Sequence, residues 1–225
     1  MSIKIIYPKK TSNKSSSNLV LFVDEKFNTK GIKKYISDSE HSYISDLLKT
    51  SDLQKNIFVY EVNSRKKIVL ISVKKNLKSS DIENLGAVFY GRINYGKNSE
   101  YFINSDSVVN YNNNFLDHFI HGLKLKSYKF NKYKTKKENR IISINVIGQK
   151  NKNFLRNQIK FKALEEGTFY ARDLVSEPGN ILHPDEYAKR LSSLRKNGLK
   201  VNVYDEKKLK KLGMHALLGV GQGSI

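Results

Sequence analysis

The sequence contains no cysteine among its 225 residues. This absence excludes disulfide bonds, thiolate zinc sites and cysteine nucleophiles, so any metal ion must be held by His, Asp, Glu or Lys. No window approaches the ~20 consecutive apolar residues of a membrane helix, and the start, MSIKIIYPKKTSNKSSSN, lacks the apolar stretch of a secretory signal. We therefore expect a cytoplasmic protein without a membrane partner.

Several common catalytic motifs are also missing. The sequence has no Gly-x-Ser-x-Gly nucleophile elbow, no Walker phosphate loop and no His-Glu-x-x-His helix, which leaves serine hydrolases, P-loop proteins and zincins without support. Gly219, Gly221 and Gly223 superficially resemble a dinucleotide loop, but the third glycine is misplaced and no acidic residue follows about twenty positions later. We interpret these glycines as a tight turn that leads out of a strand.

Acidic residues are few compared with basic ones. The chain has 41 Lys and Arg residues against 21 Asp and Glu residues, which gives a formal charge of +20. A positive field of this size attracts nucleic acid or anionic membranes. Lys, Asn, Ile, Tyr and Phe are also over-used together, as AT-rich codons would cause, and the lysines are scattered along the chain. We favour codon bias and keep non-specific DNA binding as the alternative.

Hydrophobic residues, at 39%, suffice for a folded core, and strands and helices alternate along the chain. Short β-branched and aromatic runs between polar turns predict strands, and apolar residues at three- and four-residue spacing predict helices. The expected strands are 3–7, 19–23, 57–62, 67–73, 101–109 and 140–147, and the expected helices are 30–49 with a break near 38–41, 79–93, 113–125 and 152–176. This alternation indicates an α/β layered domain.

The helix at 152–176 has four apolar residues that we expect to form its buried stripe: Leu155, Ile159, Leu164 and Leu174. Pro178 and Gly179 end this helix, because neither residue propagates one. The elements expected beyond them are a helix from Pro184 to about Lys196 that Gly198 caps, a strand at 199–204, a helix from Asp205 to Gly213 and a strand at 216–220. The last segment is therefore expected to be a helix–strand–helix–strand unit.

Histidines are the candidate metal ligands of this cysteine-free chain. His118 and His121 are three residues apart beside Asp117, so they could be paired ligands on one helix face. Two ligands do not make a site, and we favour polar residues at the edge of an amphipathic helix. We expect His183 to cap the next helix, and His215 to be structural.

Two polar groups of residues have both structural and functional interpretations. The lysine-rich segment 124–137 should be a surface connection, although lysines interleaved with aromatic residues are also typical of single-strand nucleic-acid surfaces. Arg172, Asp173 and Glu177 lie close together in sequence. On a helix we expect them to form surface ion pairs rather than a catalytic group.

Three segments, in the same order and spacing, resemble the leucyl (cytosol) aminopeptidase family. The first, FLDHFIHGLKLKSYKFNKYKT at 115–135, matches the family's helix, Gly-Leu-x-Leu and Ser-Tyr-x-Phe-x-x-Tyr-Lys. The second, ARDLVSEPGNILHPDEYAKR at 171–190, is similar to its Ala-Arg-Asp-Leu-x-x-x-Pro-x-Asn. The third, KLKKLGMHALLGVGQGS at 208–224, is similar to its Leu-Gly-Met and Gly-x-Gly-Gln-Gly-Ser.

The resemblance implies a domain organisation. Residues 1–150 would be an N-terminal mixed-sheet α/β domain flanked by helices, 151–177 a long connecting helix, and 178–225 the incomplete start of an α/β catalytic domain. Family members remove N-terminal amino acids from peptides with two divalent ions (zinc, manganese or magnesium) and form hexamers.

The resemblance also implies where the catalytic groups lie. In the family, the metal-binding and catalytic Lys, Asp, Glu and Arg residues follow the Gly-Gln-Gly-Ser segment, so their counterparts would come after Ile225. We therefore assign no catalytic, metal-binding or cofactor-binding residue to this chain, and expect it to be inactive alone and to hold no metal. The alternative is a basic DNA-binding or assembly module derived from the family.

Overall fold

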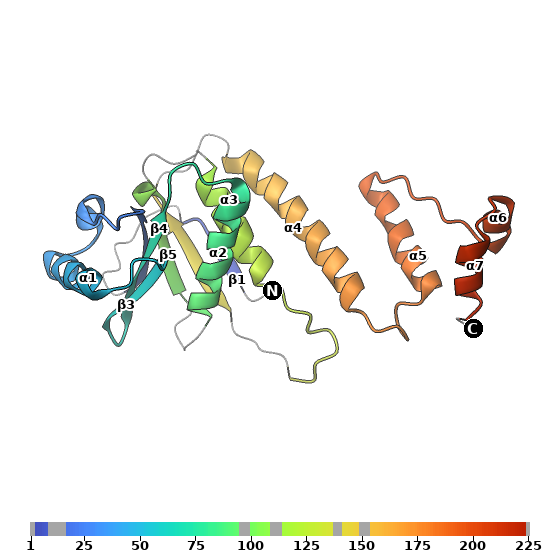
Figure 1. The fold of residues 1–225 in the computed structure, drawn as a ribbon, viewed down its shortest axis with the longest axis horizontal. Helices are drawn as coiled ribbons and strands as arrows, with labels where there is room; N and C mark the ends of the chain where they lie inside the picture. The colour runs from blue at the N-terminus through green and yellow to red at the C-terminus, as the bar shows by residue number, and fades with distance from the viewer. Residues whose placement is uncertain are drawn as a thin grey trace. The chain divides into compact units, whose positions relative to one another are not determined.

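Six strands form one sheet in the first part of the computed structural model (Figure 1). The strands are β1 (Ile3–Ile6), β2 (Asn18–Asp24), β3 (Ile57–Asn63), β4 (Lys66–Val73), β5 (Glu100–Asn104) and β6 (Ile142–Ile147), in the order β1-β6-β5-β2-β4-β3. Neighbours pair in parallel, except that β3 and β4 are antiparallel. The sheet is therefore mixed, as the resemblance implied, and the strand predictions in this part of the chain are confirmed with one exception. The strand predicted at 101–109 ends at Asn104, and residues 105–107 form a 3-10 helix instead.

The structure describes residues 3–8, 17–94, 100–108, 114–136, 141–148 and 154–223. The chain divides into two units, Met1–Phe169 and Tyr170–Ile225. The helices are η1 (Lys30–Tyr35), α1 (Asp38–Thr50), α2 (Ser79–Ile93), η2 (Ser105–Ser107), α3 (Phe115–Lys126), α4 (Phe154–Ser176), α5 (Pro184–Ser192), η3 (Ser193–Asn197), α6 (Glu206–Lys211) and α7 (His215–Gly221). None of the helices within these ranges is long and apolar enough to cross a membrane.

Both faces of the sheet carry a hydrophobic core. Val20 and Phe22 of β2 pack in a cluster with residues of α2 and α3, whereas Leu21 and Val23 pack in a second cluster with residues of α1. Successive side chains of a strand point to opposite faces, so a central strand covered on both sides is apolar throughout. This explains the uninterrupted run LVLFV and defines a layered α/β unit.

The second unit differs from the prediction. We expected strands at 199–204 and 216–220, but residues 199–205 have no regular secondary structure and α7 occupies 215–221. A strand requires backbone hydrogen bonds to a neighbouring strand, and the described part of this unit contains none. Leu217 and Val220 are 52% and 80% exposed, so no core selects an extended conformation here.

The buried face of α4 also differs from the prediction. Leu155 and Ile159 are 74% and 73% exposed, Leu164 is exposed, and Leu174 is half-buried. The buried residues are Phe161, at 7% exposed, and Glu165, at 3%. The apolar spacing predicted the wrong face because one of these two buried residues, Glu165, is polar.

Candidate functional site

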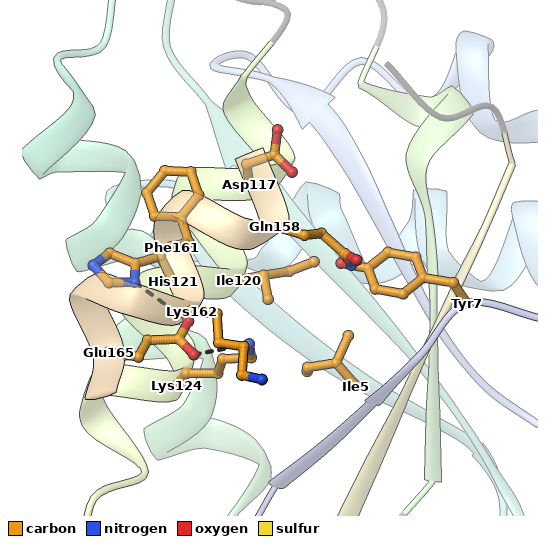
Figure 2. Close-up of a pocket in the computed structure, with 10 residues that line it drawn as sticks. All are labelled: Ile5, Tyr7, Asp117, Ile120, His121, Lys124, Gln158, Phe161, Lys162 and Glu165. Carbon is orange, nitrogen blue, oxygen red and sulfur yellow. Dashed lines mark hydrogen bonds and ion pairs between the residues drawn. The ribbon is translucent and has the colours of Figure 1, made fainter. Parts of the chain in front are cut away.

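A cavity of about 270 Å³ lies within the first unit, where the end of β1 meets α3 and α4 (Figure 2). β1 contributes Ile5, followed by Tyr7, and α3 contributes the face that includes Ile120. α4 closes the cavity with Phe161 and its polar neighbours. The lining combines apolar surface with acidic, basic and amide groups, as small-molecule sites do.

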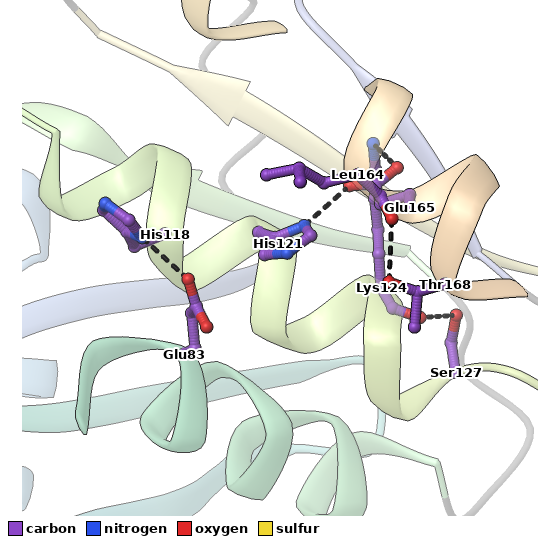
Figure 3. A network of polar contacts seen from close by, with 8 residues as sticks. All are labelled: Glu83, His118, His121, Lys124, Ser127, Leu164, Glu165 and Thr168. Carbon is purple, nitrogen blue, oxygen red and sulfur yellow. Dashed lines mark hydrogen bonds and ion pairs between the residues drawn. The ribbon is translucent and has the colours of Figure 1, made fainter. Parts of the chain in front are cut away.

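Glu165 is the centre of a polar network between α4 and α3 (Figure 3). One carboxylate oxygen, Oε2, accepts a hydrogen bond from Lys124 Nζ at 2.9 Å, and Oε1 lies 3.4 Å from His121 Nδ1. The Glu165 side chain is only 4% exposed. A buried carboxylate is costly unless it is paired, so this network fixes the position of α4 along α3.

The two histidines of α3 lie on either side of this contact. His118 Nδ1 is 2.8 Å from Glu83 Oε1 of α2, whereas His121 faces Glu165 of α4. Both imidazole rings pack against Phe161, with ring centroids 5.0 and 4.8 Å away. The two rings therefore pair with different carboxylates on different helices, which corresponds to a packing role.

A second polar contact joins α3 and α4 near the start of both helices. Asn157 Nδ2 donates to Asp117 Oδ2 at 2.7 Å and to Asn114 Oδ1 at 2.9 Å. Asp117 is buried. Asp117, His118 and His121, which we had considered as possible metal ligands, thus contact three different partners, Asn157, Glu83 and Glu165.

Tyr7 lies at the β1 side of the cavity. Burial raises the pKa of Tyr7 to about 12, while its hydrogen bond with Gln158 acts in the opposite direction. The negative charges of Asp117 and Glu165 raise the pKa further. Tyr7 is therefore a neutral phenol at physiological pH rather than a base.

The other residues that the sequence analysis considered lie at the starts of helices or in ion pairs. His183 is the N-cap residue of α5, although its side chain makes no capping hydrogen bond, and His215 is the first residue of α7. Glu177 Oε1 pairs with Arg190 Nη1 at 2.9 Å, and Arg190 Nε pairs with Glu186 at 2.9 Å. These ion pairs raise the pKa of Arg190 further above its ordinary value.

The glycine-rich end of the sequence does not form the turn that we expected. Gly219 and Gly221 lie in α7 and Gly223 in the turn after it, so the expected turn out of a strand is wrong. Of the basic segment, residues 124–126 form the end of α3, and residues 127–136 form a short connection. The Tyr128 ring anchors this connection, with its centroid 5.3 Å from that of Phe169. Tyr133 is exposed.

The potential metal ligands that the structure describes are dispersed. Across the described ranges, no three His, Asp or Glu side chains come together in a group that could hold a metal ion. The buried acidic groups near α3 are instead paired with Lys124 and Asn157.

Comparison with known proteins shows which proteins this chain resembles in sequence. The model of the cytosol aminopeptidase family, catalytic domain, matches residues 169–225. A probable cytosol aminopeptidase of Nitrobacter winogradskyi is 36% identical over 169 residues, which cover 70% of this chain and 33% of that protein. A probable cytosol aminopeptidase of Bradyrhizobium sp. is 42% identical over 111 residues, which cover 46% of this chain and 21% of that protein.

Solved structures support the same fold. A mutant of tomato leucine aminopeptidase matches with a TM-score of 0.70 at 15% identity, covering 94% of this chain and 46% of that one. The bottromycin maturation enzyme BotP in complex with Mn matches with a TM-score of 0.60 at 14% identity, covering 88% of this chain and 40% of that one. At these identities the likeness concerns the fold alone.

The chain has a mixed-sheet α/β fold and is similar in sequence to proteins described as peptidases. More particularly, the chain is related to the leucyl (cytosol) aminopeptidases, of which the N. winogradskyi relative is matched over 33% of its length. These relationships give no support to the alternative of a DNA-binding or assembly module.

Proposed function

We propose that the chain supplies the N-terminal domain and the start of the catalytic domain of a dimetal-dependent leucyl aminopeptidase, which removes N-terminal amino acids from peptides in the cytoplasm. The observation that carries this proposal is the match of residues 169–225 to the family's catalytic domain, after a six-stranded mixed-sheet unit. The family's hexameric assembly is part of the same proposal.

We propose the domain limits 1–150, 151–177 and 178–225 for the N-terminal domain, the connecting helix and the start of the catalytic domain. The helix α4 supports this division, because its residues are shared between the two units, which divide at Phe169 and Tyr170. The contacts of Phe161 and Glu165 anchor its first half to the N-terminal unit.

Two divalent ions, manganese, zinc or magnesium, would supply a metal-activated water and polarise the peptide carbonyl in the complete enzyme. BotP was solved in complex with Mn, which supports manganese as one candidate. The described residues of this chain offer no cluster for such ions. We therefore propose that the 225-residue chain alone binds no ion pair and is inactive.

The purified chain can be tested directly for release of N-terminal leucine from a peptide, with manganese or zinc added and with a chelator as control. We expect no metal-dependent release from the chain alone. A chelator-sensitive release by the pure chain would refute its proposed inactivity and would require a metal site among its own residues.

A further inference from the structure

The cavity between β1, α3 and α4 contains a buried carboxylate with unused hydrogen-bonding capacity. Glu165 is 3% exposed and lines the cavity (Figure 2). Its contacts are one hydrogen bond from Lys124 at 2.9 Å and a long contact of 3.4 Å with His121. An ionised carboxylate offers about four acceptor positions, so Glu165 can accept further hydrogen bonds from a ligand ammonium group.

The same cavity contains an ammonium group that is only loosely engaged. Lys162 lines the cavity, its side chain is 75% exposed, and Glu166 Oε1 lies 3.8 Å from its Nζ. This separation is longer than a hydrogen bond, so the ammonium group is able to bind a ligand anion. Figure 2 shows the Lys162 and Lys124 side chains next to each other on one side of the cavity.

The rest of the lining limits the size and polarity of a ligand. Ile5, Ile120 and Phe161 supply apolar surface, and the volume of about 270 Å³ is just below the range of about 300–1,000 Å³ for small-molecule sites. The acidic side chains Asp117 and Glu165 balance Lys124 and Lys162 in charge. A small ligand without net charge leaves this balance unchanged.

We propose that this cavity binds a small zwitterion with a short apolar body, which is the chemistry of a free α-amino acid. Its ammonium group donates to Glu165, its carboxylate accepts from Lys162, and its side chain contacts Ile120 and Phe161. This inference rests on the cavity alone and is independent of the proposed aminopeptidase activity, because the site lies within the N-terminal unit.

Calorimetric titration of the full 225-residue chain with three matched probes tests the proposal. The probes are norvaline, pentanoate, which lacks the ammonium group, and butylamine, which lacks the carboxylate. Each analogue loses one charge-assisted hydrogen bond, so norvaline should bind at least about tenfold more tightly than either. No binding of norvaline, or equal binding of either analogue, overturns the proposal.

Two exposed lysines of α4 provide a matched pair of variants. Lys162→Ala should weaken norvaline binding by about tenfold and leave butylamine binding unchanged. Lys160→Ala removes the same charge from the same helix, but Lys160 does not line the cavity, so both affinities should remain. An equal loss in the two variants would mean general charge attraction and would overturn the proposed site.

Glu165 has to be tested with the fold monitored, because its substitution also removes contacts between α3 and α4. Glu165→Gln should weaken norvaline and butylamine binding while pentanoate binding stays the same. If this variant does not fold, methyl chemical shifts of Ile5 and Ile120 in the unaltered chain provide a second measurement. Both methyl groups should shift on norvaline addition, and unchanged shifts would contradict binding in this cavity.

Discussion

The carbonyl group of Glu83 in α2 lies directly against Gly122 of α3, with no space for a Cβ atom at that glycine. The contact is reciprocal, because a Cβ at Gly86 of α2 would overlap the carbonyl of Phe119 in α3. The two helices thus pack backbone against backbone on one face of the sheet.

This packing predicts that Gly122→Ala destabilises the protein. The new methyl group must push α2 and α3 apart, and overpacking of this kind costs about 1–3 kcal/mol. Gly91→Ala is the control within α2, where a Cβ meets nothing within 4 Å. The control should stabilise by about 0.5–1 kcal/mol through helix propensity, and urea unfolding measures both. Equal stability of the two variants would contradict the close contact.

A second prediction concerns the ion pair of Glu40 in α1 and Lys66 in β4, whose side chains are each 12% exposed. Lys66→Met should lower the free energy of unfolding by about 1–3 kcal/mol, because it leaves a largely buried carboxylate without its partner. Lys33→Met removes a partner from the exposed pair with Asp38 and should change stability by less than about 1 kcal/mol. Chemical denaturation of both variants measures the difference, and equal losses would contradict the burial of the first pair.

The same ion pair predicts a pH dependence. Burial alone would raise the pKa of Glu40, but the hydrogen bonds from Lys66 and the Ser37 backbone outweigh it and hold the pKa below its ordinary value. A lowered folded-state pKa means that the stabilisation is present above the unfolded-state pKa and is lost as the pH falls through the folded-state pKa. The stability difference between the parent chain and Glu40→Gln should therefore shrink with acidification, and a constant difference would count against the pair.

Tyr7 predicts an effect at alkaline pH. The chain has 13 tyrosines, and burial raises the pKa of Tyr7 to about 12 from 10.0. The difference in ultraviolet absorbance between the parent chain and Tyr7→Phe should therefore show a phenol that ionises near pH 12. Because the folded-state pKa is raised, the associated stabilisation is complete below pH 10 and is lost as the pH rises. Ionisation near pH 10 in the folded chain would contradict the burial of Tyr7.

The buried face of α4 gives a further prediction. Phe161 packs between His118 and His121, so Phe161→Ala should destabilise the first unit by about 3–5 kcal/mol and increase hydrogen exchange in the first half of α4. Ile159→Ala, at a residue that is 73% exposed, should change stability by less than about 0.5 kcal/mol. A larger loss of stability for Ile159→Ala than for Phe161→Ala would contradict this buried face and support the apolar stripe that the sequence suggested.

The sequence predicted the first unit well, because strands such as LVLFV and IVLISV are buried on two faces and have a strong apolar signal. The α4 contact was not predictable from apolar spacing, since Glu165 and Asn157 carry it through polar partners distant in sequence. The strands expected in the second unit failed for another reason. Short apolar runs do not by themselves distinguish strand from helix, and the described residues provide no neighbouring strand.

The most direct test of the proposed function is the intact mass of the native protein purified from its source cells by following manganese-dependent release of N-terminal leucine. We predict that this activity belongs to a protein well above the 25.9 kDa of the present chain, because the described residues offer no cluster that could hold the metal ions. An active protein of 25.9 kDa would contradict the proposal.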